Sequence, residues 1–228
     1  MRRLVIRALP GVNALTRIAL LPGAYQGPED FVREGFVTVL RARQLSVDLE
    51  FIAPQLQHVT DRSVLDAIRR EVVDPARAAG CQRVWLGGVS LGGFLSLAYA
   101  AAHRGTVDGL CLFAPYLGNR SMTQEIARAG GVANWQPTAA SDSSGPSAPV
   151  VTNDEERRVW QYIQELQRQD PPMRDLPVCL GLARQDRFAP SHQLLAEALP
   201  AQAVYSVDGG HDWPAWRAMW QAFLDRNF

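Results

Sequence analysis

The sequence has no lysine, few cysteines and no long apolar run. All 23 basic residues of the 228-residue chain are arginines, which excludes Schiff-base and serine–lysine mechanisms. The three cysteines lie far apart, and no Cys-x-x-Cys or His-x-x-x-His spacing occurs, so we predict neither a disulfide framework nor a metal site. No apolar run approaches the roughly 20 residues that span a bilayer, and arginines interrupt the apolar residues near the N-terminus. We therefore expect a cytoplasmic protein with no membrane partner.

Charge of one sign is not in excess either. The 23 basic residues are balanced by 23 acidic ones, and no long basic run occurs, so we expect no nucleic-acid partner. Hydrophobic residues make up 47% of the chain, enough for a large buried core. The length fits one domain, and we interpret residues 1–228 as a single unit.

Residues 84–97 contain the motif from which the functional prediction starts. A short apolar run leads into Gly88-Val89-Ser90-Leu91-Gly92, and an Ala- and Leu-rich segment follows at residues 94–102. Strand, glycine-flanked turn and helix are the context in which Gly-x-Ser-x-Gly holds an exposed nucleophile. Glycines without Cβ atoms let the strand and the helix pass closely and lift Ser90 clear of the sheet. The alternative is a glycine-rich turn with an ordinary serine.

Strand-like and helix-like segments alternate along most of the chain. Strands are predicted at residues 4–9, 17–21, 46–53, 84–86, 107–113, 177–183 and 203–207. Helices are predicted at residues 29–43, 61–79, 94–102, 190–199 and 213–227. This alternation predicts an α/β fold, with a mainly parallel sheet covered by helices on both faces.

The alternation stops between residues 117 and 175. A helix is predicted at residues 122–129, a mobile Ser-, Ala- and Pro-rich stretch at 137–149, and an amphipathic helix at 153–169. We interpret residues 117–175 as a small, largely helical inserted cap. Its Trp135 and Trp160, together with Tyr25, are candidates for lining a substrate site, although aromatic residues at helical spacing are more often core.

Three side chains follow predicted strands in the order Ser90, Asp186, His211, the order of a Ser–acid–His triad on an α/β sheet. A serine hydroxyl is a weak nucleophile, and an adjacent imidazole must take its proton. His211 has an ordinary pKa near neutrality and suits this role. Asp186 would hold the imidazole in the correct tautomer and stabilise the imidazolium.

Each of these residues has an alternative interpretation. Asp186 could be a surface carboxylate paired with Arg184 or Arg187, and His211 could be an ordinary loop histidine. The aspartates that flank His211 are too close in sequence to orient it, and Asp212 is expected to cap the last helix. Weaker candidates for the base are His58, His103 and His192.

The tetrahedral intermediate of acyl transfer needs hydrogen-bond donors for its oxyanion. The backbone N–H of Leu91, directly after the serine, is one candidate. A second is expected from the loop after the earlier strand, which points to the N–H of Ala24 or the neighbouring N–H of Tyr25.

From residue 18 to the C-terminus the chain resembles an α/β-hydrolase. Gly88-Val89-Ser90-Leu91-Gly92 matches the serine turn, and Leu21-Pro22-Gly23 stands where an oxyanion loop often has His-Gly. Gly209-Gly210-His211-Asp212-Trp213, followed by Trp216, resembles the histidine segment of carboxylesterases similar to S-formylglutathione hydrolase. The resemblance implies hydrolysis of an acyl ester through an acyl-serine intermediate, without a cofactor.

We therefore expect a serine hydrolase whose partner is a small-molecule carboxylic ester or thioester. Two alternatives stay open. The same triad could transfer the acyl group to an alcohol or amine instead of water. A hydrolase-like binding protein without turnover is the other alternative, because a fold alone does not confer activity.

Overall fold

The computed structural model describes residues 1–8, 11, 14–55, 63–137 and 153–228. Within these residues the chain forms one sheet of seven strands in the order β1-β3-β2-β4-β5-β6-β7. Only β1 is antiparallel to its neighbour, so the prediction of a mainly parallel sheet is confirmed. The strands are β1 (Arg2–Ile6), β2 (Thr16–Leu21), β3 (Val47–Ala53), β4 (Arg83–Val89), β5 (Gly109–Phe113), β6 (Val178–Ala183) and β7 (Val204–Val207).

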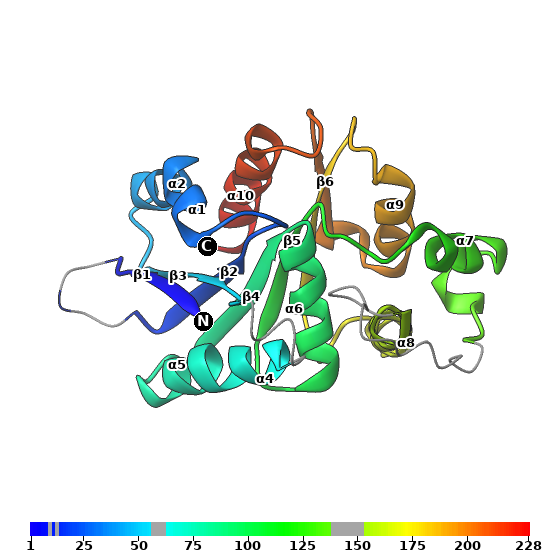
Figure 1. Ribbon diagram of the computed structural model, residues 1–228, viewed down its shortest axis with the longest axis horizontal. Coiled ribbons are helices and arrows are strands. Elements are labelled where there is room, and N and C mark those ends of the chain that lie inside the picture. Colours follow the sequence, from blue (N-terminus) through cyan, green and yellow to red (C-terminus); the bar gives the residue numbers. More distant parts are fainter. Residues whose placement is uncertain (9–10, 12–13, 56–62, 138–152) are drawn as a thin grey trace.

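Helices cover both faces of the sheet, as predicted (Figure 1). One face carries α1 (Pro28–Arg33), α2 (Phe36–Ala42) and α10 (Trp213–Asn227). The other face carries α4 (Val64–Ile68), α5 (Asp74–Ala78), α6 (Leu91–Ala102), α8 (Asn153–Gln167) and α9 (Ala189–Ala198). A strand that is covered on both sides reads as a continuous apolar run. In β2, for example, Ile18 faces one core and Ala19 the other, and both are fully buried.

Two predicted helices differ from the structure. The helix expected at residues 29–43 is two helices, because Gly35 takes a left-handed conformation (φ 86°) between α1 and α2. The helix expected at residues 61–79 begins at Val64 and contains a π-helical segment, η1 (Arg69–Val73), directly before α5. Pro75 in the first turn of α5 has no N–H to donate, which favours such a departure from the regular pattern. Asp61, which was expected to cap the N-terminus of this helix, lies outside the described residues.

The connection between β5 and β6 holds α7 (Arg120–Arg128), η2 (Val132–Asn134) and α8. The apolar face of α8 joins the same core as α6 and β5 through Val159, Trp160, Ile163 and Leu166. Helix α8 therefore serves as a crossover helix of the sheet. The interpretation of residues 117–175 as an inserted cap stays a prediction, and the mobile stretch expected at 137–149 lies, after residue 137, outside the described residues.

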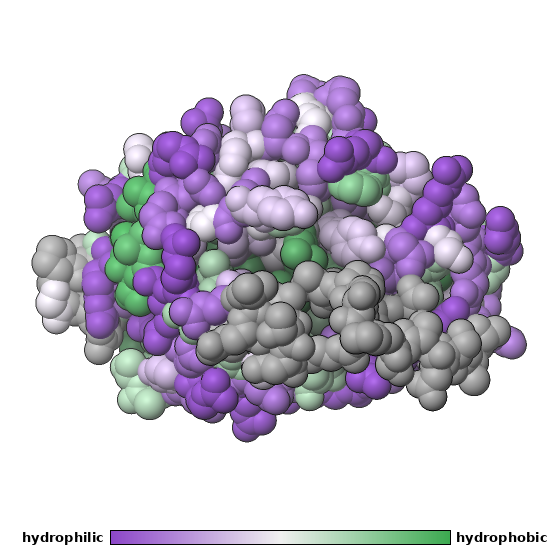
Figure 2. All heavy atoms as spheres, in the orientation of Figure 1, coloured by the Kyte–Doolittle hydropathy of each residue, from purple (hydrophilic) through white to green (hydrophobic). Residues whose placement is uncertain are grey.

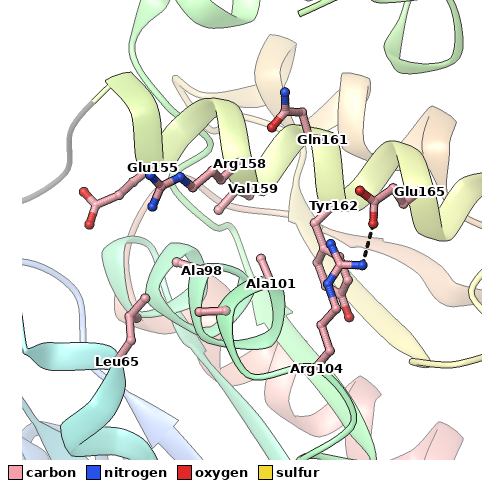
Figure 3. Close-up of a pocket in the computed structure, with 11 residues that line it drawn as sticks. Leu65, Ala98, Ala101, Arg104, Glu155, Arg158, Val159, Gln161, Tyr162 and Glu165 are labelled. Carbon is pink, nitrogen blue, oxygen red and sulfur yellow. Dashed lines mark ion pairs between the residues drawn. The ribbon is translucent and has the colours of Figure 1, made fainter. Parts of the chain in front are cut away.

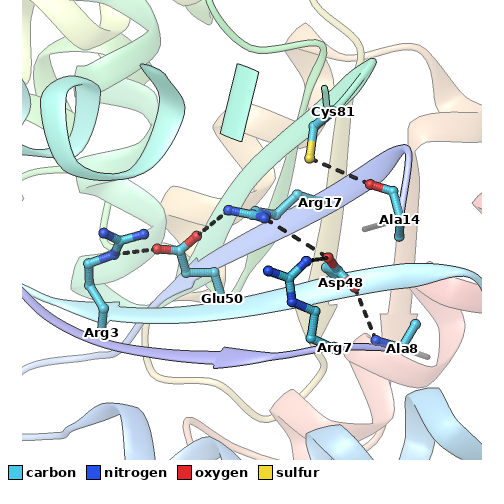
Figure 4. Close-up of polar contacts among 8 residues, drawn as sticks. All are labelled: Arg3, Arg7, Ala8, Ala14, Arg17, Asp48, Glu50 and Cys81. Atoms are coloured by element: carbon cyan, nitrogen blue, oxygen red, sulfur yellow. Dashed lines mark hydrogen bonds and ion pairs between the residues drawn. The ribbon is translucent and has the colours of Figure 1, made fainter. Parts of the chain in front are cut away.

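Charged side chains are buried at the β1–β3–β2 edge (Figure 4). Asp48 and Glu50 on β3 are fully buried. Arg17 on β2 lies 3.2 Å from the Glu50 carboxylate and 3.9 Å from that of Asp48. Arg3 and Arg7 complete the network, with Arg3 Nε 2.5 Å from Glu50 and Arg7 3.4 Å from Asp48. Buried carboxylates persist when paired in this way, and here they fix β1 against β3.

Figure 2 shows a face of the molecule that is mostly hydrophilic, with hydrophobic residues in small separate areas. No helix in the described part of the chain combines the length and apolarity needed to cross a bilayer.

Candidate active site

Ser90 stands in the turn between β4 and α6 with a strained backbone, φ 50° and ψ −115°. The turn is possible because two glycines leave room for the end of β2. A Cβ atom at Gly88 would lie 2.2 Å from the carbonyl oxygen of Leu21, and one at Gly92 would lie 2.1 Å from the same atom. The strain, typically about 1–3 kcal/mol, is maintained by this close packing.

The turn is also held by backbone hydrogen bonds to the neighbouring strand. The N–H of Ser90 donates to the carbonyl of Phe113 at 3.1 Å. The carbonyl of Ser90 accepts from the N–H of Tyr116 at 2.9 Å, besides the N–H groups of the first turn of α6. The backbone of Ser90 is therefore fixed by the loop that follows β5, through a contact of Tyr116 that the sequence did not predict.

The structure brings together the three side chains that the sequence predicted. His211, in the loop between β7 and α10, has its Nε2 2.8 Å from Ser90 Oγ and its Nδ1 2.7 Å from Asp186 Oδ2. A carboxylate can only accept, so Nδ1 carries the proton and Nε2 is left to accept from the serine hydroxyl. This is the tautomer that a general base needs.

Asp186 is 5% exposed, and its position is fixed from two sides. Oδ2 accepts from His211, and Oδ1 accepts from the backbone N–H of Phe188 at 2.8 Å. Burial raises the pKa of this carboxyl, but the hydrogen bonds from His211 and Phe188 outweigh burial, and the net pKa lies below the ordinary value. Asp186 is therefore ionised at neutral pH.

The imidazole of His211 is enclosed by two aromatic rings that the sequence did not assign to positioning it. Phe188 and Trp216 meet it edge-on, with ring centroids 4.9 Å and 5.2 Å away. These contacts restrict rotation of the imidazole out of line with Ser90. Phe188 stands two residues after Asp186, and only that proximity could have indicated its role from the sequence.

The alternative interpretation of Asp186, a surface carboxylate paired with an arginine, does not hold. Arg184 pairs with Asp208 at 2.6 Å and not with Asp186, and Arg187 lies over the ring of Phe188 at 4.8 Å. Asp212 caps α10 by accepting from the N–H of Ala215 at 3.1 Å, as predicted.

Two of the three weaker histidine candidates make their contacts away from Ser90. His103 lies 3.2 Å from Asp66. His192 is 1% exposed and bonds the carbonyl of Pro115 at 3.0 Å, and burial lowers its pKa. His58 lies outside the described residues.

The loop after β2, which was expected to supply an oxyanion-hole donor, lies against Ser90. A Cβ at Gly23 would lie 3.5 Å from Ser90 Cβ. In the described part of the chain, the backbone N–H groups of Leu91, Ala24 and Tyr25 have no hydrogen-bond partner, so they are available to an oxyanion. The Gln26 side chain, which the sequence analysis missed, holds this loop by accepting from the N–H of Gly23 at 3.0 Å. The ring of Tyr25 is fully exposed, and its role toward a substrate stays a prediction.

The prediction that Trp135 and Trp160 line the substrate site is wrong. Trp135 is 2% exposed and its indole N–H donates to Glu125, while Trp160 is 0% exposed and donates to the carbonyl of Leu117. Both indoles are buried in the core that α6 and α8 share, which leaves almost no indole surface for a ligand.

A hollow of about 550 Å³ lies next to residues that contact Ser90 and His211. Its lining includes Tyr116 and Phe188, which contact Ser90 and His211 respectively. A smaller cavity of about 280 Å³ lies between α6 and α8 (Figure 3), with Ala98 and Ala101 among its lining residues and the Arg104–Glu165 ion pair, 2.7 Å, among the charged ones. Ser90, Asp186 and His211 line neither cavity, and only the first is lined by residues that contact them.

Known proteins provide an independent comparison. Residues 18–226 match the model of the alpha/beta hydrolase family. No curated protein matches the sequence significantly.

Solved structures share the fold at low sequence identity. A ferulic acid esterase is 14% identical, with a TM-score of 0.65 over 96% of this chain and 87% of that one. The S-formylglutathione hydrolase of Staphylococcus aureus is 12% identical, with a TM-score of 0.62 over 94% and 82%. The fluorophosphonate-binding serine hydrolase F of the same organism is 14% identical, with a TM-score of 0.63 over 94% and 84%. These similar structures show the fold. The family is shown by the family model, which matches residues 18–226: the chain belongs to the α/β-hydrolases.

Proposed function

We propose that the protein is a serine hydrolase that cleaves carboxylic esters or thioesters through an acyl-serine intermediate. The observation that carries the proposal is the position of the His211 imidazole, which lies within hydrogen-bond distance of both Ser90 Oγ and Asp186. Such a contact between a nucleophile and an oriented base is the geometric signature of an activated serine.

Acylation begins when Ser90 Oγ attacks the carbonyl carbon and His211 Nε2 takes the hydroxyl proton. The carbonyl oxygen becomes an oxyanion, which the N–H of Leu91 and the N–H of Ala24 or Tyr25 stabilise. The imidazolium, held by the ionised Asp186, then gives its proton to the departing alcohol or thiol. The bond from carbon to the leaving group breaks, and the acyl group stays on Ser90.

Deacylation uses the same groups with water in place of the alcohol. His211 Nε2 takes a proton from water as its oxygen attacks the acyl carbon, and the imidazolium returns a proton to Ser90 Oγ. The products are the free acid and the resting enzyme.

The comparisons with known proteins support the fold on which this proposal depends. Two of the similar structures are named as an esterase and a serine hydrolase, and the chain shares their fold. At 14% identity, the shared fold does not identify a substrate. The proposal therefore depends on the geometry of Ser90, His211 and Asp186.

The test combines covalent labelling with turnover. A fluorophosphonate probe is expected to label the wild-type protein on the peptide that contains Ser90, and the protein is expected to hydrolyse p-nitrophenyl butyrate. Ser90→Ala should abolish labelling and lower kcat by a factor on the order of 10⁴ or more. Ser206→Ala, which changes an exposed serine of β7, is the matched control and should label like the wild type. Undiminished labelling of Ser90→Ala, or folded wild-type protein without esterase activity, would contradict the proposal.

A further inference from the structure

The hollow beside the triad is positively charged. Arg120, at the start of α7, and Arg187, directly after Asp186, both line it and both are exposed. Among the described residues, no acidic side chain lines this hollow. Its other polar groups are neutral and include Thr123 and Gln124.

Neither of these two arginines has an acidic partner within the described residues, in contrast to Arg157 and Arg184. Arg157 is paired with Glu125 at 2.8 Å, and Arg184 with Asp208 at 2.6 Å. No ion pair joins Arg120 or Arg187 to a described carboxylate, and Arg187 stacks on Phe188 instead. Their charges are therefore available to an anion that enters the hollow.

One carboxylate, Glu156, lies directly behind the wall of the hollow. It is 2% exposed, and its oxygens accept hydrogen bonds from Tyr116 and Asn119. Because these wall residues occupy its acceptor sites and separate it from the hollow, Glu156 does not pair with Arg120 or Arg187.

Two residues that line the hollow also contact Ser90 and His211. Tyr116 donates its N–H to the carbonyl of Ser90, and Phe188 packs on the imidazole of His211. A substrate whose ester carbonyl reaches Ser90 would extend one end past these two residues toward the arginines.

We propose, on the basis of the serine-hydrolase function above, that the substrate is an ester or thioester that carries a free carboxylate, such as a monoester of a short dicarboxylic acid. Guanidinium groups bind carboxylates through paired N–H donors, and this pairing orients as well as attracts the ligand. Arg120 and Arg187 are thus specificity-determining residues, which select the anionic substrate without taking part in bond breaking.

The first experiment compares matched esters. The protein is assayed with p-nitrophenyl hydrogen glutarate and with p-nitrophenyl pentanoate, which have acyl chains of equal length and differ in the terminal carboxylate. A second pair, 4-carboxyphenyl acetate and phenyl acetate, places the carboxylate in the leaving group. The wild type should prefer the anionic member of one pair in kcat/KM by about tenfold, and the pair that shows it identifies the half of the substrate that enters the hollow.

Variants then assign this preference to the arginines. Arg120→Gln should reduce the anionic-to-neutral ratio of kcat/KM about fivefold, and Arg120→Glu should reduce it further. Arg128→Gln, at the other end of α7, is the matched control and should keep the wild-type ratio. A ratio that stays unchanged in Arg120→Gln and in the Arg120→Gln/Arg187→Gln double variant would overturn the inference, even if Ser90 is the nucleophile.

Binding provides a readout that does not depend on turnover. Ser90→Ala protein should bind monomethyl glutarate in calorimetry, and adding the two arginine substitutions should weaken binding about tenfold or more. Equal affinity with and without the arginines would also overturn the inference. Inactive wild-type protein that still shows arginine-dependent binding would contradict the hydrolase proposal and leave the anion site standing.

Discussion

Tyr116 connects the buried carboxylate of Glu156 to the backbone of Ser90. Its hydroxyl donates to Glu156 Oε1 at 2.8 Å, and its N–H donates to the carbonyl of Ser90 at 2.9 Å. A residue of α8 thus fixes the loop that holds the serine turn, although α8 and the turn are far apart in the sequence.

Replacing Glu156 should loosen this loop. Glu156→Ala leaves the hydroxyl of Tyr116 and two donors of Asn119 without their acceptor, and a buried donor without a partner costs about 1–3 kcal/mol. We expect the free energy of unfolding, measured in urea, to fall by about 2–4 kcal/mol. Glu165→Ala on the same helix breaks only an exposed ion pair and should cost less than about 1 kcal/mol. Equal losses for the two variants would contradict this role of Glu156.

Asp186 should make stability depend on pH in the acid range. Its pKa in the folded protein lies below the ordinary value of 3.8, so its stabilising effect is present above that value and is lost as the pH falls through the folded pKa. The unfolding free energy of the wild type should therefore drop more steeply below about pH 4 than that of Asp186→Asn. Urea unfolding at pH 7 and at several acid pH values measures the two slopes, and parallel slopes would contradict the assignment.

The same substitution should reduce catalysis. The amide of the Asp186→Asn variant would no longer fix the proton on His211 Nδ1, so the base would spend most of its time in the wrong tautomer. We expect kcat for p-nitrophenyl butyrate to fall by a factor on the order of 10³–10⁴. Asp208→Asn, at a carboxylate that pairs with Arg184 on the surface, serves as the control and should retain near-wild-type kcat.

The serine turn should not tolerate a side chain at Gly92. The Cβ atom of Gly92→Ala would lie 2.1 Å from the carbonyl oxygen of Leu21, a backbone atom that cannot move without shifting β2. Overpacking of this kind costs about 1–3 kcal/mol or more. Gly210→Ala, whose nearest contact is 3.6 Å, should change the thermal midpoint little. A Gly92→Ala protein as stable as the Gly210→Ala protein would contradict the close packing of the turn.

The buried ion network should depend on its central cation. Arg17→Met removes the buried cation that Glu50 and Asp48 share and leaves each carboxylate only its more exposed arginine, Arg3 or Arg7. Removing one partner of a buried ion pair costs about 3–5 kcal/mol. Arg33→Met removes a surface cation paired with Asp30 and should cost less than about 1 kcal/mol. Urea midpoints that fall equally in the two variants would rule out a structural role for Arg17.

The strands and the meeting of the triad followed from local patterns. Apolar runs marked the strands, and their carboxyl ends in a parallel sheet lie at one edge, so Ser90, Asp186 and His211 were expected to lie together. These patterns do not predict what surrounds each side chain in the folded protein. Trp160 has the same spacing whether α8 faces a ligand or packs on α6, and only the packing decides.

Contacts between segments that lie far apart in the sequence could not be predicted from local patterns either. Glu156 carries no local signal of burial, because its three donors come from residues 116–119, nearly forty positions earlier. Gln26 likewise resembles any polar loop residue until its side chain is seen on the N–H of Gly23. The break at Gly35 depends on a left-handed conformation that glycine permits and does not require.

The most direct measurement is the capture of the acyl intermediate. Protein mixed with p-nitrophenyl butyrate is quenched in acid within milliseconds, digested and analysed by mass spectrometry. The account predicts a butyryl group on Ser90, in the peptide that spans the end of β4 and the start of α6, and no such adduct in Ser90→Ala. A butyryl group on another residue, or turnover by the wild type that continues unchanged in Ser90→Ala, would contradict it.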